Sequence, residues 1–223
     1  MSPLIAMRGT GAAGPLVLQA ELPQELVLSF NRIAERVTRS DSAMKAHDWS
    51  GQLSGNHRGE FRITELLLSN FEAQKFLLEV SRSFVERAPN RFMNVKRAES
   101  VRDKTVNIVI QEAWINEMVA GDFNPVHHHP HCDISCVGFL EIPDGYDNEL
   151  ATLSPHKRVA GFLQFIDGRP AFGNDPIWHV KPRVGEFYMF PSWLLHCVYP
   201  FRSPGVRRSL SANLMLAVGD GHP

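Results

Sequence analysis

Two segments in the first half of the chain show the hydrophobic spacing of amphipathic helices. In residues 23–38, apolar side chains recur every three or four positions, and Pro23 suits a first helical turn. Residues 69–88 repeat that spacing, Ser69 and Glu72 have the form of a capping box, and Pro89 ends the pattern. Both segments are predicted to be helices with one face to bury. The polar, Gly- and Ser-rich residues 39–60 between them predict a loop, with a short strand at 60–63.

After residue 100 the pattern changes to short β-rich runs separated by turn residues. The predicted strands are residues 106–114, 134–142, 159–166, 186–190, 197–200 and 208–218. Strands at this spacing indicate a sandwich or a closed barrel. Because 223 residues suit one generous domain, we expect a single domain, in which residues 1–100 form a helical and irregular cover on a β core of residues 101–219.

Composition and charge narrow the function classes. A formal net charge of −1 gives no broad electrostatic reason to bind nucleic acid or an anionic membrane. Three cysteines without a Cys-x-x-Cys pair indicate neither a disulfide framework nor a zinc ribbon, which favours a reducing compartment. The sequence shows neither a run of about 18 apolar residues nor a signal-peptide layout. We therefore expect a soluble, cytoplasmic protein.

The most distinctive stretch runs from Asn124 to Asp133, where four of the ten histidines fall within five positions. Neutral imidazole binds Fe, Zn, Cu and Ni well. On an extended chain alternate side chains share a face, so His127, His129, His131 and Asp133 could project together. A metal site and a solvated polar loop are both open readings of this cluster alone.

A second stretch, residues 181–213, contains Gly185-x-x-x-x-Phe-Pro-Ser-x-x-x-His196 and then Arg207-x-Ser209. Together with the histidine cluster, this order resembles the Fe(II)- and 2-oxoglutarate-dependent oxygenases. Within that superfamily the chain is similar to a bacterial and phage branch with a prolyl-hydroxylase-like catalytic core. The resemblance covers about residues 106–216. It implies a double-stranded β-helix, a cupin-like jelly roll with flanking helices.

The resemblance also implies one Fe(II) at the open end of the barrel, held by three protein ligands, with room left for 2-oxoglutarate and O₂. His127 and a near neighbour would supply the first two ligands and His196 the third. The second ligand has two competing registers, His127-His128-His129 and His131-Cys132-Asp133, and a mixed triad of His127, Asp133 and His196 is a third option.

We favour His129 as the second ligand over Asp133. The strand predicted at 134–142 would begin directly after Asp133 and leave no turn. The alternative role for Asp133 is that of a strand-start residue hydrogen-bonded to nearby backbone.

Arg207 is the expected anchor for the distal carboxylate of 2-oxoglutarate, with Ser209 beside it. A guanidinium can meet a carboxylate with two parallel hydrogen bonds and stays charged when enclosed. On a strand, a polar row would line the site while Arg208 points to the opposite face; the row is Arg207, Ser209, Ser211 and Asn213. A surface salt bridge is the competing explanation for either arginine.

The expected function is therefore an oxygenase that converts 2-oxoglutarate to succinate and hydroxylates a second substrate. Two alternatives are a three-histidine, cupin-type dioxygenase that does not use 2-oxoglutarate, and a non-catalytic metal-binding jelly-roll module. The expected partner is a small-molecule or peptidyl substrate, for which an amino acid, free or within a peptide, is one candidate. A homodimer is compatible with the sequence. The predicted loop at 144–158 is a candidate for contacting that substrate.

Overall fold

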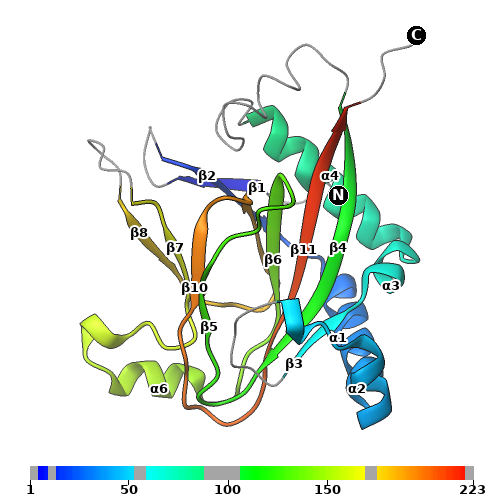
Figure 1. Cartoon of the computed structure of the whole chain (residues 1–223). Coiled ribbons are helices and arrows are strands. Elements are labelled where there is room, and N and C mark those ends of the chain that lie inside the picture. The colour runs from blue at the N-terminus through cyan, green and yellow to red at the C-terminus, as the bar shows by residue number, and fades with distance from the viewer. Residues whose placement is uncertain (1–4, 10–13, 53–58, 88–105, 169–174, 219–223) are drawn as a thin grey trace.

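The computed structural model describes residues 5–9, 14–52, 59–87, 106–168 and 175–218 as two antiparallel sheets that face each other (Figure 1). The large sheet has the strand order β1-β2-β9-β6-β11-β4-β3, and the small sheet has the order β5-β10-β7-β8. The large sheet consists of β1 (Ile5–Gly9), β2 (Leu16–Glu21), β3 (Gly59–Arg62), β4 (Val106–Met118), β6 (Ile134–Glu141), β9 (Glu186–Pro191) and β11 (Arg207–Val218). The small sheet consists of β5 (Asn124–His127), β7 (Leu163–Ile166), β8 (Ile177–Val180) and β10 (Leu195–Val198).

Side chains from both sheets meet in a core between them. Phe139 of β6 and Tyr188 of β9 project from the large sheet, and Phe165 of β7 meets them from the small sheet. All three are at most 2% exposed. Two facing sheets around such a core form the expected double-stranded β-helix.

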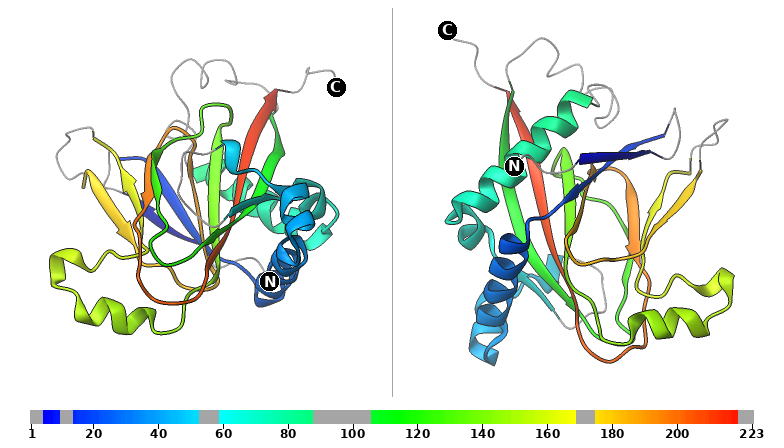
Figure 2. Two further views of the ribbon diagram at one scale, coloured as in Figure 1. Left: turned by 60° about the horizontal axis from the view of Figure 1, so that its bottom comes forward. Right: turned by 180° about the vertical axis from the view of Figure 1, so that it is seen from behind.

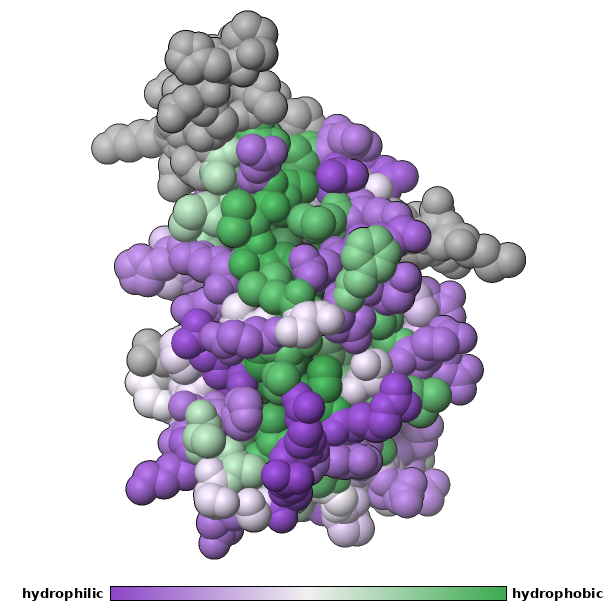
Figure 3. Space-filling model, turned by 90° about the vertical axis from the view of Figure 1, so that its right-hand side faces the viewer, coloured by the Kyte–Doolittle hydropathy of each residue, from purple (hydrophilic) through white to green (hydrophobic). Residues whose placement is uncertain are grey.

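The two predicted helices cover the outer face of the large sheet (Figure 2). They are α1 (Gln24–Thr38) and α4 (Phe71–Arg87). Their apolar stripes join the helix-facing residues of the sheet in one buried cluster, in which Phe30, Ala34, Val80 and Phe84 are at most 1% exposed. Seen from the helical side, apolar side chains form a band between polar ones (Figure 3). None of the helices in the described ranges combines the length and the apolar character that crossing a membrane requires.

The start of α4 corrects the predicted capping box at Ser69 and Glu72. The side chain of Asn70 accepts the hydrogen bond from the Ala73 backbone N–H at 3.1 Å, so Asn70 caps this helix. Ser69 instead donates to the Glu65 carbonyl at 2.7 Å and ends the preceding helix, α3 (Thr64–Leu68). The capping box was wrong because the sequence pattern did not reveal this short helix.

Two predicted loops also contain helices. Within residues 39–60 lie α2 (Asp41–His47), capped by Ser40, and the 3₁₀ turn η1 (Ser50–Gln52). The strand expected after them is confirmed as β3. Residues 144–158 contain α6 (Tyr146–Thr152) and the 3₁₀ turn η2 (Pro155–Lys157), and α6 lies at the bottom of the view in Figure 1.

A buried carboxyl group on β3 makes stability depend on pH. Glu60 is fully buried, and desolvation, aided by the charge of Asp48, raises the pKa of its carboxyl group from 4.5 to about 8. Between these values the folded protein keeps a proton that the unfolded chain loses. The stability contribution is therefore complete below about pH 4.5 and is lost as the pH rises towards 8.

Glu60→Gln is expected to raise the free energy of unfolding at pH 8 by on the order of 1–3 kcal/mol, with little change near pH 4.5. Urea denaturation of both proteins across this pH range measures the difference. A slope between pH 5 and 8 that persists unchanged in Glu60→Gln would contradict the assignment of the slope to this carboxyl group.

Candidate active site

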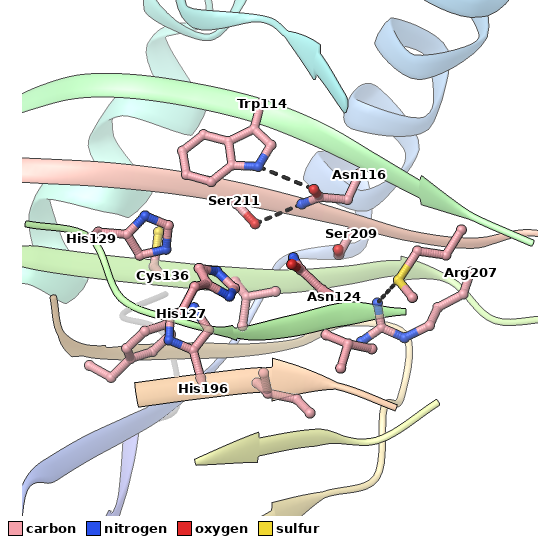
Figure 4. A pocket seen from close by; sticks show the side chains of 15 residues that line it. Trp114, Asn116, Asn124, His127, His129, Cys136, His196, Arg207, Ser209 and Ser211 are labelled. Carbon is pink, nitrogen blue, oxygen red and sulfur yellow. Dashed lines mark hydrogen bonds between the residues drawn. The ribbon is translucent and has the colours of Figure 1, made fainter. Parts of the chain in front are cut away.

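A pocket lies between the two sheets, and strands of both sheets contribute side chains to its wall (Figure 4). Most of the wall comes from β4, β5, β10 and β11. The lining residues are Trp114, Asn116, Met118, Asn124, His127, His129, Cys136, Val137, Leu163, Phe190, His196, Val198, Arg207, Ser209 and Ser211.

Three histidines meet on one side of this pocket. His127 at the end of β5 and His196 on β10 are direct partners across the two strands. His129 follows in the next loop, where its backbone N–H donates to the Ser192 carbonyl at 2.9 Å. One ligand nitrogen from each of the three rings lies within 4.8 Å of the others. This geometry is able to hold a single metal ion.

The surroundings of His129 and His196 favour the neutral form that binds metals. Nδ1 of His127 lies 2.8 Å from the Pro125 carbonyl, and Nδ1 of His196 lies 2.9 Å from the Leu194 carbonyl. A carbonyl oxygen only accepts, so both rings carry their proton on Nδ1 and their lone pair on Nε2. Burial, followed by the charges of neighbouring histidines, lowers the pKa of His129 to about 3 and holds the pKa of His196 well below its usual value. Three neutral imidazoles suit Fe, Zn, Cu or Ni.

The other candidates from the histidine stretch lie outside this group. His131 is exposed. The Asp133 carboxylate accepts the backbone N–H of Leu216 at 2.8 Å, and the Asp133 backbone N–H donates to the Leu214 carbonyl at 3.0 Å. Asp133 thus adopts the backbone-bonded, strand-start arrangement that was the alternative to a ligand role.

The two arginines at the start of β11 have different environments. Arg207 points into the pocket and is 2% exposed. Its Nε donates to the Gly161 carbonyl at 3.1 Å, its guanidinium lies 5.2 Å from the centre of the Phe139 ring, and its buried Nη2 has no hydrogen-bond partner in the part of the chain that the structure describes. Desolvation lowers the pKa of Arg207 to about 10, which leaves it charged at neutral pH.

Arg208 points to the helical side of the sheet, as the strand alternation predicts. Its guanidinium donates to the Glu117 carboxylate at 2.6 Å, to the Glu141 carboxylate at 2.5 Å and to the Asn31 side chain at 2.9 Å. Because these acceptors lie on α1, β4 and β6, Arg208 ties the helical cover to the sheet.

The segment predicted as a candidate substrate-contacting loop contains a residue that supports the surroundings of Arg207, and its contact with substrate stays a prediction. Tyr146 of α6 donates from its hydroxyl to the Ala160 carbonyl at 2.5 Å. The next residue, Gly161, has φ +67°, and a Cβ atom there would lie 3.0 Å from the Tyr146 ring. A side chain at this position would be strained and crowded, so glycine allows the close approach that presents the Gly161 carbonyl to Arg207.

Sequence reasoning missed several residues that line the pocket. Trp114, Asn116 and Met118 project into it because β4 continues four residues beyond the predicted end of that strand. Their alternation with Ala113, Ile115 and Glu117 was the available signal. Asn124 and Cys136 also line the pocket, and Oδ1 of Asn124 is buried without a hydrogen-bond partner among the described residues.

A double-stranded β-helix with a histidine cluster able to hold a metal ion fits a mononuclear non-haem oxygenase or a cupin. Residues 112–213 match the sequence model of the family described as "Putative 2OG-Fe(II) oxygenase". This match covers just under half of the chain, includes every residue that lines the pocket, and shows that the chain is similar there to the Fe(II)- and 2-oxoglutarate-dependent oxygenases. The chain is therefore an enzyme whose cofactors are Fe(II), 2-oxoglutarate and O₂.

Solved structures show the same fold. The α-ketoglutarate-dependent carbocyclase SnoK from nogalamycin biosynthesis matches with a TM-score of 0.56 and 11% identity, covering 92% of this chain and 83% of SnoK. The epimerase SnoN from the same biosynthesis matches with a TM-score of 0.54 and 12% identity, covering 93% and 84%.

A prolyl hydroxylase from Trichoplax adhaerens, solved with a peptide fragment of hypoxia inducible factor, matches with a TM-score of 0.50 and 12% identity, covering 95% of this chain and 83% of that one. At these identities the likeness concerns the fold alone. A comparison with curated proteins found no match.

Proposed function

We propose that His127, His129 and His196 are the iron ligands of this oxygenase and that Arg207, with Ser209 beside it, anchors the distal carboxylate of 2-oxoglutarate. The bound iron and co-substrate would supply the oxidising chemistry, in which 2-oxoglutarate and O₂ yield succinate, CO₂ and one oxygen atom for the substrate. The observation that carries this proposal is the buried Nη2 of Arg207, which has no hydrogen-bond partner among the described residues and lies in the same pocket as the three histidines.

The chain's own residues contribute binding, orientation and exclusion of water. Three neutral imidazoles add no negative charge to the site, so the anionic co-substrate is the main source of charge to balance Fe(II). The guanidinium of Arg207 supplies the complementary cation at the other end of the pocket. Three apolar side chains of the pocket wall, Leu163, Phe190 and Val198, limit the entry of water.

The alternative of a three-histidine dioxygenase without 2-oxoglutarate agrees less well with the pocket. Such an enzyme has no need for a buried cation, and burying one without a carboxylate partner is costly. A non-catalytic module is tested more directly, because it would form no succinate. Iron-dependent conversion of 2-oxoglutarate to succinate by the purified protein is the measurement that separates the proposed function from both alternatives.

For the second substrate we propose a peptidyl or free amino acid. The support is the shared fold with the prolyl hydroxylase from Trichoplax adhaerens, which was solved with a peptide fragment. A screen for compounds that stimulate succinate formation tests this proposal. Stimulation by nucleotides or sugars, with peptides and amino acids silent, would contradict it. A cytoplasmic location and a homodimer stay predictions.

The second metal ligand is tested by two matched variants. His129→Ala is expected to lose most of the iron affinity, because only two protein ligands would remain. Asp133→Ala is expected to keep that affinity and to lose about 1–2 kcal/mol of stability, because its carboxylate bonds to the Leu216 backbone instead. Titration of both proteins with Fe(II) under anaerobic conditions gives the two affinities. Normal affinity in His129→Ala together with loss in Asp133→Ala would reverse the assignment.

A further inference from the structure

A chain of hydrogen bonds crosses from β4 to β11 and ends inside the pocket. The indole Nε1–H of Trp114 donates to Oδ1 of Asn116 at 3.2 Å, and Nδ2 of Asn116 donates to the Ser211 hydroxyl oxygen at 2.9 Å. All three side chains are at most 9% exposed, and all three line the pocket. Figure 4 shows these two hydrogen bonds, which end at Ser211.

The indole of Trp114 determines which group donates and which accepts in both hydrogen bonds. An indole N–H can only donate, so Asn116 must present its carbonyl oxygen to Trp114. Its amide nitrogen must then face Ser211, whose oxygen accepts. The single hydroxyl proton of Ser211 is consequently available to another acceptor, and no acceptor for it is found among the described residues. The fold thus holds a hydroxyl donor, already oriented, at the wall of the pocket.

The position of this donor complements that of Arg207. The two residues belong to one row on β11, with Ser209 between them, and lie about 13 Å apart along the strand. Figure 4 shows Ser211 on the side of the three histidines and Arg207 at the opposite end. An arginine side chain and a five-carbon diacid together are long enough to occupy that interval.

We propose that the Ser211 hydroxyl donates a hydrogen bond to the 2-oxo acid end of 2-oxoglutarate, and that Trp114 and Asn116 are positioning residues that fix its direction. This inference rests on the proposed anchoring of the distal carboxylate by Arg207. A donor at the histidine end fixes which end of the co-substrate faces the metal, because the two ends of the diacid meet different partners. The pocket then selects for the 2-oxo group as well as for the second carboxylate.

Binding to protein loaded with Mn(II), which does not turn over, tests the proposal by calorimetry. Two ligands are compared: 2-oxoglutarate and 2-oxobutanoate, which has the same 2-oxo acid end and no distal carboxylate. Ser211→Ala is expected to weaken both ligands by a similar factor, roughly tenfold, because a hydrogen bond to a charged group is lost. Arg207→Ala is expected to weaken 2-oxoglutarate alone.

Further variants separate a positioning role from a merely structural one. Trp114→Phe keeps an aromatic ring, although a smaller one, and removes the N–H. It should weaken 2-oxoglutarate binding when introduced into the wild-type protein and have no further effect when added to Ser211→Ala. Ser211→Thr, which keeps a hydroxyl group, should retain the affinity. Ser81→Ala is the matched control, since this buried serine on α4 bonds to the Leu77 carbonyl and does not line the pocket.

The remaining outcomes show whether the role of Ser211, the positioning roles of Trp114 and Asn116, or the proposed function itself is wrong. Unchanged affinity in Ser211→Ala, or weakening of 2-oxoglutarate with 2-oxobutanoate unaffected, would overturn the inference and leave the proposed function standing. Additive effects of Trp114→Phe and Ser211→Ala would refute the positioning roles. If the Mn(II)-loaded wild-type protein binds neither ligand, the proposed function fails and the inference fails with it.

Discussion

Replacing His196 with alanine is expected to abolish both metal retention and turnover. His196 is the buried member of the histidine group and the direct cross-strand partner of His127. Its loss would leave two protein ligands and an empty position where the third imidazole stood, so the metal would exchange with solvent. Metal content after dialysis and iron-dependent succinate formation measure the two effects.

Aerobically purified wild-type protein is expected to contain Zn or Ni in place of iron, because Fe(II) lies low in the affinity series for such sites. Total metal is therefore the relevant quantity. His128→Ala is the matched control: this histidine is adjacent in sequence but exposed, and its variant should keep one metal per chain. Stoichiometric metal in His196→Ala would remove His196 from the site.

Arg207→Ala is expected to raise the 2-oxoglutarate concentration required for half-maximal succinate formation by roughly 30- to 1000-fold. The loss of an enclosed, charge-assisted pair costs on the order of 2–4 kcal/mol. Iron should stay bound, because Arg207 lies at the opposite end of the pocket from the three histidines. Co-substrate titrations with metal content measured on the same samples separate the two effects.

Arg208→Ala provides the comparison on the other face of the same strand. Removing this guanidinium breaks its ion pair with the buried Glu117 carboxylate, so the variant should be less stable. Well below its unfolding temperature it should need no more 2-oxoglutarate than the wild-type protein does. If neither arginine affects the requirement, the three-histidine dioxygenase becomes the better explanation; if Arg208 alone does, the assignment of faces on β11 is wrong.

Long elements with regular apolar spacing were predictable from the sequence, and short ones were not. The helices α1 and α4 and the strands β6 and β11 follow their patterns closely, because each buries a continuous apolar face. By contrast, α6 buries only Tyr146 and Leu150. Its position depends on contacts such as that of the Glu149 carboxylate with the backbone N–H of Ser203 at 2.8 Å, which no local pattern reveals.

In the candidate site, too, some residues were predictable from the sequence and others were not. The resemblance to the oxygenase superfamily implied that His127, His129, His196 and Arg207 share one site. All four line one pocket, and their roles stay predictions. The predicted strand ended at residue 114, before Asn116 and Glu117, whereas β4 includes both. Their partners, Ser211 and Arg208, are supplied by β11 about ninety residues later, so the continuation of β4 is a tertiary effect.

The pairing of His127 with His196 has a consequence for local folding. The strand β5 has four residues, lies at the edge of the small sheet, and pairs there with β10. Such a strand belongs to the part of a protein that opens first, since few backbone hydrogen bonds hold it. A metal ion bound by one residue from each strand would act as a cross-link between them. Dissociation of the metal and fraying of the sheet edge would then be one coupled event, and the site would lose its shape as it lost its ion.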